Sequence, residues 1–395
     1  MATVTSGPLD GVRILDMSVM ISGPLSAMVL ADQGAEVIKV EAPGLGDLMR
    51  VLGTQKNGTT GIYLLNNRGK RSLVIDVKKP EGLHMMQTLI GTADVLIQNF
   101  RPGALDRIGL GYEDVAAIND QLIYVSISGY GSDGPNANLR VYDNVIQSAS
   151  GLTSLQGDSA TGEPDVLRTL VCDKVTAYTA AQAITAALFA RERGKGGQHI
   201  TLSMLDSAIA FMWPDGAMDA ALLDEDVFRT PTIAANYRVN RLQDGFCTMS
   251  VVSDAEFRSL CNVLGSPELA DDGRFATSAA RAMNVDAFVA ELNGRLADLT
   301  VKEFEERARR FELPAAVSVS LAQVHTTPQA VHNEIFVERQ HPSAGMVREV
   351  RSAPRFSKTP TRLSDPAPRF GEHSVEIADE LGLDGAALEA AGVIF

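Results

Sequence analysis

Short apolar runs alternate with helix-like segments through the first third of the chain. VRILD (residues 12–16) and AEVIKVE (35–41) have the pattern of buried strands, and GPLSAMVLADQGA between them has that of a helix. This helix is expected to end at Gly34, because glycine is the usual residue just past a helix C-terminus. Strands that alternate with helices at this spacing predict an α/β fold with a parallel, doubly wound sheet.

The alternation continues to about residue 131. Further strands are expected at RSLVIDV (71–77), DVLIQNF (94–100) and QLIYVSISGYG (121–131). Helices are expected at 80–93, where Pro80 occupies an early position that needs no amide hydrogen, and at 102–109.

A long uncharged segment, Val175 to Ala190, holds sixteen residues of which seven are alanine. It predicts a helix built to be buried, stopped by the basic turn and glycines of RERGKGG. QHITLSML then predicts a strand, and LDSAIAFMW a helix.

The pattern of apolar and polar residues changes from about Asp224, which favours a second, smaller domain. TPTIAANYRVNRLQDGFCTMSVV (230–252) is typical of an antiparallel pair turned at 243–245, and two amphipathic helices follow at 253–265 and 285–299. Ser253 is suited to cap the first of them.

Composition narrows the function classes. With 395 residues, 45% hydrophobic and 21% charged, the chain is an ordinary globular protein. A net charge of −14 argues against nucleic acid or an anionic membrane as a partner. The N-terminus lacks a secretory pattern and the three cysteines lack CxxC spacing, so a cytoplasmic protein with reduced thiols is expected. The six histidines form no HxxxH pair, which disfavours a histidine-built metal site.

Residues 66–107 reverse the acidic balance, with seven cationic and four acidic side chains, a net charge of +3. This window suits a polyphosphate ligand, although a solvated basic face explains it equally well. Glu41 stands where a dinucleotide fold binds ribose, but the SVMISGP turn lacks GxGxxG, so a nicotinamide or flavin cofactor is disfavoured. The cations of the window are Arg68, Lys70, Arg71, Lys78, Lys79, Arg101 and Arg107.

Asp173 lies at the N-terminal end of the uncharged helix and has two compatible interpretations. Aspartate is among the best N-cap residues. The same position beside a helix N-terminus would hold the carboxylate ionised, and exclusion of water would make it a nucleophile toward an activated carbonyl.

Seven segments occur in this order along the chain: PLDGVRILDMS, LADQGAEVIKVEAPGLGD, NNRGKRSLVIDVKKPEG, ADVLIQNFRPGALDRIGLGYE, VSISGYGSDGP, RGKGGQHITLSMLD after the Asp173 helix, and GEHS. As a set they resemble the class III CoA-transferases, the family of formyl-CoA:oxalate CoA-transferase, carnitine CoA-transferase and the related α-methylacyl-CoA racemases.

The resemblance implies an interlocked, ring-like homodimer whose large Rossmann-like domain is formed by both ends of each chain. The expected parts are residues 1–222, a small α+β domain at 223–325, and a segment at 326–395 that returns to the large domain. Asp173 falls on the nucleophile of the family, and no cofactor is tightly bound because CoA and acyl-CoA are substrates. The positions that carry over as CoA contacts are Ile21, Ser22, Ala42, Ile75, Asp76, Val77, Lys78, Asn99, Phe100, Arg101, Arg107, Arg140, Val141, Tyr142 and Asp143.

The implied reaction moves CoA from an acyl-CoA to a small carboxylic acid, including dicarboxylic acids, through an aspartyl-CoA thioester on Asp173. The alternative within the fold is an acyl-CoA racemase, but Tyr142 stands where that branch has its proton-transferring histidine. A non-catalytic CoA-binding protein is a third possibility, and it would not need Asp173.

Two departures from the family pattern concern the substrate side of the site. TPTIAANY (230–237) has no glycine where some members have a glycine-rich closing loop, and Ile21 replaces a polar glutamine, which puts oxalate in doubt. Trp213, Tyr142 and Met204 are candidates to line the acyl pocket, and core packing is the equal alternative for them.

Overall fold

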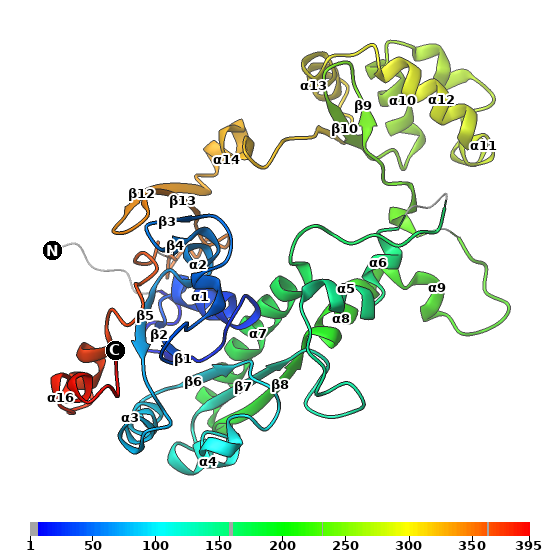
Figure 1. Cartoon of the computed structure of the whole chain (residues 1–395). Helices are drawn as coiled ribbons and strands as arrows, with labels where there is room; N and C mark the ends of the chain where they lie inside the picture. The colour runs from blue at the N-terminus through cyan, green and yellow to red at the C-terminus, as the bar shows by residue number, and fades with distance from the viewer. Residues whose placement is uncertain (1–6, 158–160, 231, 362) are drawn as a thin grey trace. The chain divides into compact units, whose positions relative to one another are not determined.

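Two compact units make up the chain (Figure 1). The computed structural model describes residues 7–157, 161–230, 232–361 and 363–395. The large unit comprises Met1–Met218 and Asn333–Phe395, and the small unit comprises Asp219–His332. Both ends of the sequence therefore belong to the large unit.

Six parallel strands form the central sheet of the large unit, as the alternation of apolar runs predicted. They pair in the order β5-β2-β1-β6-β7-β8. The order reverses between β1 and β6, and in open α/β sheets ligands bind outside the carboxyl ends of the strands at such a reversal. The strands are β1 (Arg13–Asp16), β2 (Glu36–Glu41), β5 (Lys70–Val74), β6 (Val95–Gln98), β7 (Ile123–Ser128) and β8 (Gln198–Ser203).

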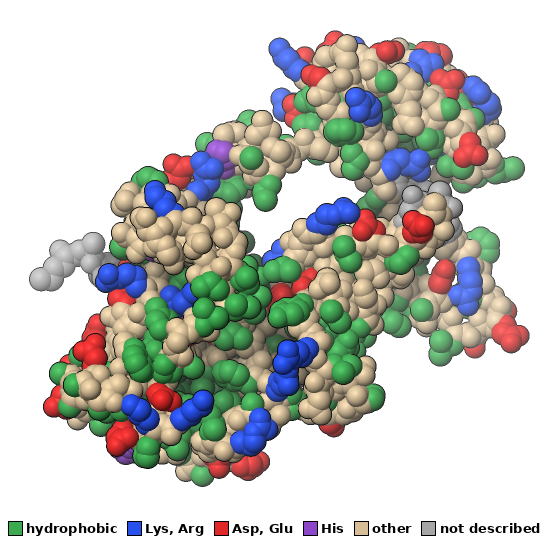
Figure 2. All heavy atoms as spheres, viewed as in Figure 1, with side chains coloured by type: hydrophobic (Ala, Val, Ile, Leu, Met, Phe, Trp, Pro, Cys, Tyr) green, Lys and Arg blue, Asp and Glu red, His purple; other side chains and the backbone are tan. Residues whose placement is uncertain are grey.

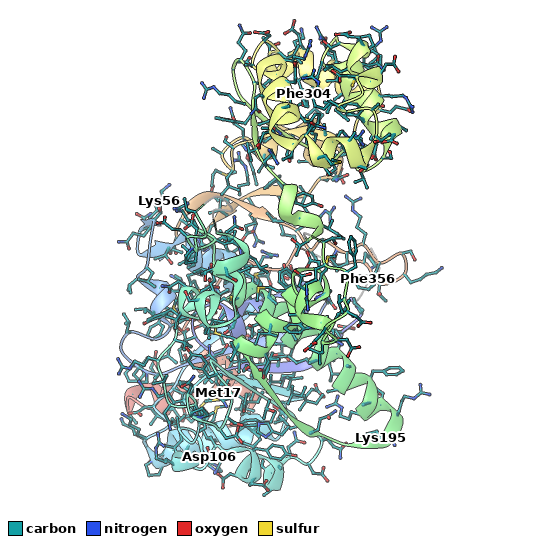
Figure 3. The ribbon with its side chains drawn as sticks, turned by 90° about the vertical axis from the view of Figure 1, so that its right-hand side faces the viewer. Met17, Lys56, Asp106, Lys195, Phe304 and Phe356 are labelled. Carbon is teal, nitrogen blue, oxygen red and sulfur yellow. The ribbon has the colours of Figure 1, made fainter. Side chains whose placement is uncertain are left out.

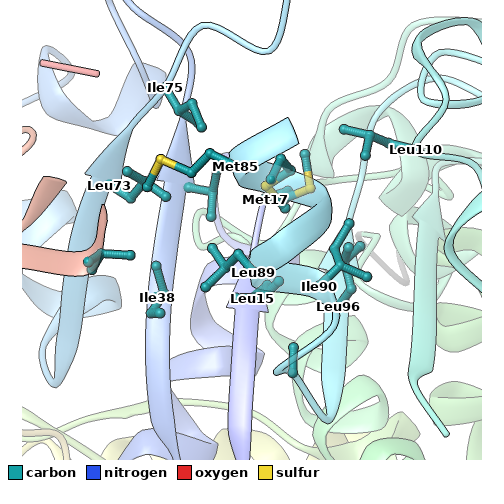
Figure 4. Close-up of a cluster of buried hydrophobic side chains, with 14 of the residues drawn as sticks. Leu15, Met17, Ile38, Leu73, Ile75, Met85, Leu89, Ile90, Leu96 and Leu110 are labelled. Atoms are coloured by element: carbon teal, nitrogen blue, oxygen red, sulfur yellow. The ribbon is translucent and has the colours of Figure 1, made fainter. Parts of the chain in front are cut away.

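Helices cover both faces of this sheet, because successive strand residues point to opposite sides. Leu15 packs among Met85 and Leu89 on one face (Figure 4), whereas its neighbour Ile14 packs among Ala27 and Ala180 on the other. The first face is covered by α3 (Pro80–Ile90), α4 (Tyr112–Ile118), α15 (Ser374–Glu380) and α16 (Gly385–Ala390), and the second by α1 (Ser22–Asp32) and α7 (Val171–Ala190).

Local sequence signals set several of these boundaries. Pro80 is the first residue of α3, and Gly34 follows α1 with a φ of 107°, as expected. The helix expected at 102–109 is wrong: only a single 3₁₀ turn, Asp106–Ile108, forms there.

The other elements of the large unit connect and flank this sheet. The β12–β13 hairpin is an element for which no prediction was made from the sequence. These elements are η1 (Leu48–Arg50), β3 (Gln55–Lys56), β4 (Thr59–Thr60), α2 (Gly61–Asn67), α5 (Asp143–Ala149), α6 (Leu152–Leu155), the π turn η3 (Arg191–Lys195), α8 (Met204–Gly216), β12 (Phe336–His341) and β13 (Gly345–Val350), with α9 (Met218–Ala221) at the unit boundary.

The end of the chain closes on the outer edge of β5. The Asp76 amide donates to the Val393 carbonyl at 2.9 Å, the Phe395 amide donates to the Val74 carbonyl at 3.2 Å, and Ile75 forms an antiparallel bridge with Ile394. These contacts fix the segment that follows β5, which is one of the predicted CoA-contacting segments.

The small unit packs short helices on an antiparallel sheet ordered β11-β10-β9. Its core includes Phe257, Phe275 and Phe304, the last of which is labelled in Figure 3. Ser253 caps α10 as expected, and the hairpin turns at 243–245, but residues 233–236 form a 3₁₀ turn instead of extended strand. Pro231 of that segment lies outside the described residues.

The elements of the small unit are η4 (Ile233–Asn236), β9 (Asn240–Arg241), β10 (Phe246–Met249), α10 (Asp254–Val263), η5 (Pro267–Asp271), α11 (Ser278–Met283), α12 (Val285–Leu296), α13 (Val301–Arg310), β11 (Ala315–Val317), η6 (Val324–Thr326) and α14 (Pro328–His332). In the described part of the chain as a whole, no helix combines the length and apolar character that crossing a bilayer requires.

Gly23 allows the first turn of α1 to approach the loop that precedes it. A Cβ atom at this position would lie 2.0 Å from Ser18 Oγ. We expect Gly23→Ala to lower the free energy of unfolding by roughly 1–3 kcal/mol through overpacking, measured by urea denaturation. Gly61→Ala is the control, because the nearest atom to its added Cβ is 3.7 Å away. Equal stability of the two variants would contradict this account of Gly23.

Candidate active site

Asp173 lies in the first turn of α7 but does not cap it. The N-cap position is Leu170, and no side chain caps the helix there, so the capping interpretation of Asp173 is wrong. Asp143, the first residue of α5, takes part of that role: its Oδ2 accepts a hydrogen bond from the Asp173 amide at 2.9 Å. Gln147 Nε2 donates to Asp143 Oδ1 at 2.6 Å, which holds the Asp143 carboxylate in place.

The Asp173 carboxyl group is buried, with 8% of the residue exposed. The backbone amide of Ser22, the first residue of α1, lies beside it and favours its ionised form. The carboxyl group therefore lies where the N-termini of two helices meet, and both helix dipoles favour negative charge there.

Burial nevertheless dominates the ionisation of Asp173. Loss of solvent, and after it the neighbouring Asp143, raise its pKa, the Ser22 amide offsets the rise only in part, and together they bring the pKa to about 7. The helix N-terminus was expected to keep this carboxylate ionised, but burial raises the pKa by more than the Ser22 amide lowers it. Near neutral pH the group is poised between acid and anion, a property that clusters at functional sites.

Asn99 joins the two loops at the point where the strand order reverses. Its Oδ1 accepts a hydrogen bond from the Val19 amide at 2.8 Å, and its Nδ2 donates to the Val19 carbonyl at 2.7 Å. Val19 follows β1 and Asn99 follows β6, so the side chain amide of Asn99 fixes the loop that leads to Ser22.

Most of the predicted CoA-contacting positions follow the carboxyl ends of strands, so they share one edge of the sheet. Ala42 follows β2, 75–78 follow β5, and 99–101 follow β6. The side chains of Ile21, Ser22, Ile75 and Asp143 are buried, which leaves mainly their backbone groups for a ligand. The exposed members of the set are Ala42, Lys78, Phe100, Arg101, Arg107, Arg140 and Tyr142, while Asp76, Val77, Asn99 and Val141 are half-buried.

The basic window divides into structural and free cations. Arg68 donates to Asp32 Oδ1 at 3.0 Å, and Lys70 pairs with Asp16 Oδ2 at 2.8 Å, both in the interior. Arg71 pairs with glutamates of β2 and α15, and Lys79 Nζ donates to the Ala391 carbonyl at 2.7 Å. These four side chains are engaged within the protein, so the prediction that the basic window binds a polyphosphate does not extend to them.

The remaining cations of the window have no such partner. Within the described ranges, the side chains of Lys78, Arg101 and Arg107 form no hydrogen bond or ion pair, and the same holds for Arg140. All four are exposed, and all four belong to the predicted CoA-contacting set.

The uncharged helix α7 is only partly buried within one chain. Tyr178 and Phe189 keep 59% and 62% of their surfaces exposed. A groove of about 890 Å³ runs between α1 and α7, lined by apolar residues such as Ile21, Leu25 and Tyr178. Figure 2 shows apolar side chains gathered over the part of the large unit where Figure 1 labels α1 and α7.

The residues considered for the acyl pocket separate in the structure. Met204 is buried in a cluster with Cys172 and Ile146, which supports core packing for it. Tyr142 and Trp213 are 62% and 52% exposed, so they do not serve as core packing within this chain. No group of three or more metal-binding side chains occurs in the part of the chain that the structure describes.

The raised pKa of Asp173 makes a prediction about stability. An unfolded Asp173 ionises near pH 4, whereas the folded group holds its proton to about pH 7, so the folded state loses stability as pH rises through this window. Asp173→Asn removes that cost, and we expect its unfolding free energy relative to wild type to increase between pH 5 and pH 8.5 by roughly 3 kcal/mol. Urea denaturation at the two pH values measures this, with the exposed Asp215→Asn as the control. A difference that does not change with pH would refute the burial argument.

Comparison with known proteins identifies the family of the chain. The family model of CoA-transferase family III matches residues 9–374. A succinate–glutarate CoA-transferase of Agrobacterium fabrum is 34% identical over 95% of this chain and 96% of its own length. An acetyl-CoA:oxalate CoA-transferase of Acetobacter aceti is 33% identical, over 84% of this chain and 86% of its own.

A solved structure gives the same relationship at the level of the fold. The crystal structure of a CAIB/BAIF family protein from Brucella suis superposes with a TM-score of 0.84 at 32% identity, covering 95% of this chain and all of the other. The chain therefore belongs to CoA-transferase family III, a family of enzymes that transfer coenzyme A.

Proposed function

We propose that this protein moves CoA from an acyl-CoA thioester to a small carboxylic acid, with dicarboxylic acids as the preferred class, through an aspartyl-CoA thioester on Asp173. The observation that carries the proposal is the buried Asp173 carboxyl group, which lies beside the Ser22 amide and has a pKa of about 7. A binding protein would have no use for a desolvated carboxylate at this place. CoA acts as a substrate, and no tightly bound cofactor takes part.

The exposed cations supply the CoA-binding part of the proposal. Lys78, Arg101 and Arg107 follow the carboxyl ends of β5 and β6, and Arg140 precedes α5. Guanidinium and ammonium groups without protein partners are suited to the phosphates of CoA. Because these residues share one edge of the sheet with the loop to Ser22, a CoA held there by its phosphates can extend its thiol toward Asp173.

The first half of the reaction places CoA on the enzyme. The Asp173 carboxylate attacks the donor carbonyl, the carbon–sulfur bond breaks, and a mixed anhydride and CoA thiolate form. The thiolate then attacks the aspartyl carbonyl, and the anhydride carbon–oxygen bond breaks. This frees the donor acid as a carboxylate and leaves an aspartyl-CoA thioester.

The second half reverses these steps with the acceptor. The acceptor carboxylate attacks the aspartyl thioester and releases the thiolate, which attacks the acceptor carbonyl of the new anhydride. Asp173 leaves as a carboxylate, and the acceptor leaves as its CoA thioester. The Ser22 amide is suited to stabilise the oxyanion that forms on the aspartyl carbonyl, since it already favours negative charge on this carboxyl group.

The names of the relatives support a dicarboxylic acid as the substrate class. The compared proteins of Agrobacterium fabrum and Acetobacter aceti carry succinate, glutarate and oxalate in their names. Ile21, which is 6% exposed beside Ser22, offers no polar group for a second carboxylate, and this favours an acid longer than oxalate.

Two copies of the chain form the interlocked homodimer that the family resemblance implies. The exposed apolar face of α7 supports this, because Tyr178 and Phe189 would otherwise remain in water. The groove between α1 and α7 gives the second copy a mainly apolar surface to pack against.

Covalent capture of CoA tests the proposed chemistry. We expect incubation with succinyl-CoA to add the mass of CoA less water to the enzyme, and peptide mapping to place the adduct on Asp173. Asp173→Ala should show no adduct and lose transfer activity by at least about 10³-fold, because the nucleophile is absent. A matrix of acyl-CoA donors and carboxylate acceptors, scored by mass spectrometry, identifies the substrates. An active Asp173→Ala enzyme, or α-deuterium exchange without CoA transfer, would end the proposal.

The oligomeric state is testable by light scattering. Wild-type protein should show twice the chain mass of 42.2 kDa. Tyr178→Glu places a charge on the apolar α7 face, so we expect it to shift the protein toward the monomer, whereas Ile118→Glu on α4, on the other face of the sheet, should leave the dimer intact. A monomeric wild-type protein would contradict the proposed assembly.

A further inference from the structure

The loop between β1 and α1 holds an unfavourable backbone conformation. Met20 has a φ of 64°, in the left-handed region that residues with a Cβ rarely adopt. Met20 is two residues before Ser22, whose amide reaches the Asp173 carboxyl group. A strained residue at this place persists only if surrounding contacts impose it.

Three side chains from other segments impose the conformation, one on each of three consecutive residues. Lys39 Nζ donates to the Ser18 carbonyl. Asn99 bonds both backbone groups of Val19, and Asp47 Oδ1 accepts from the amide of Met20 itself at 3.1 Å.

Lys39 and Asp47 also hold each other. Lys39 Nζ lies 3.1 Å from Asp47 Oδ2 and 3.7 Å from Asp16 Oδ2, and none of the three side chains is exposed. Asp47 is fixed in turn, since its Oδ1 accepts from the Met49 amide at 3.0 Å and its own amide donates to Glu41 at 2.9 Å. Desolvation offsets much of the attraction in a buried ion pair, so stability alone does not explain why the chain keeps one here.

We propose that Lys39 and Asp47 are positioning residues of the transfer reaction, which hold the loop at Ser18–Met20 so that the Ser22 amide faces the Asp173 carboxyl group. This inference rests on the proposed function. Neither residue contacts the carboxyl group; each acts through the backbone between β1 and α1. Without the clamp, Met20 can return to an ordinary conformation and carry the Ser22 amide away from Asp173.

Loss of the clamp has a specific chemical consequence. The charged group that acts on Asp173 is Asp143 from α5, and the Ser22 amide is the contact that opposes it. When that amide moves, the anion of Asp173 and the oxyanion of the aspartyl thioester both lose their donor. The rate constant of transfer should fall, and the acid limb of the pH profile should move to higher pH.

The double variant Lys39→Met/Asp47→Leu tests the proposal, because it exchanges both buried charges for apolar side chains of similar size. Neither partner of the ion pair is left as an unpaired buried charge, and Asp16 keeps its pairing with Lys70. With succinyl-CoA as the donor and the best acceptor from the matrix, we expect kcat to fall by roughly tenfold to a hundredfold. KM for succinyl-CoA should stay within about threefold of wild type, since CoA binding is not altered. The acid limb of kcat/KM should move to higher pH.

Two further variants separate positioning from folding. Adding Met20→Gly to the double variant should restore part of kcat, because glycine adopts positive φ without being held. Met20→Val in the otherwise native chain disfavours the left-handed conformation of a half-buried residue, and it should lower kcat and raise the acid limb even if the double variant does not fold.

The control is the buried ion pair at the other end of α1. Arg68→Met/Asp32→Leu removes charges that are equally buried but distant in sequence from the loop, and it should leave the acid limb in place. A clamp variant with wild-type kcat and pH profile, or a Met20→Val enzyme with both unchanged, would overturn the positioning role while the proposed function stands. A wild-type enzyme that forms no Asp173 adduct would instead overturn the proposed function.

Discussion

The cost of removing one carboxylate from water is the constraint on which the site depends. Asp173 loses solvent on folding, meets the charge of Asp143, and receives a single compensating contact from the Ser22 amide. A fully solvated aspartate would be ionised but weakly nucleophilic, and a fully uncompensated one would stay protonated. The intermediate state, with a pKa of about 7, keeps the anion accessible near neutrality while its hydration is already removed.

The scaffold supports this state by bringing together backbone amides, because α1 and α7 both begin at the same place. The sheet order sets their positions, since α1 follows β1 at the reversal and Asn99 ties the loop after β6 to Val19. Cations serve two different purposes in the same framework. Those that point inward, such as Lys70, neutralise carboxylates of the interior, while those on the edge, such as Arg101, remain available for phosphate.

Sequence patterns predicted what is encoded locally. The period of apolar residues gave the parallel strands, and Pro80, Gly34 and Ser253 marked helix ends because each acts on its own neighbours. The contact between Asp143 and Asp173 joins residues thirty apart, so no local signal announces it. The same holds for the division of the basic window: Arg68 and Arg107 look alike in sequence, and only burial shows that one is committed to Asp32.

A change of chemistry along one face of the sheet explains why the interior carries ions at all. On the side covered by α1, Ile14 and Val37 are apolar, but two residues further along β1 and β2 stand Asp16 and Lys39. The irregular loop before α1 folds over this end of the sheet and buries backbone groups that no neighbouring strand can satisfy. Buried amides and carbonyls need partners, and long or charged side chains are the ones that can reach them. The ions are therefore a consequence of placing an irregular, strained loop inside the protein, and the Ser22 amide at the end of that loop is what the placement provides to Asp173.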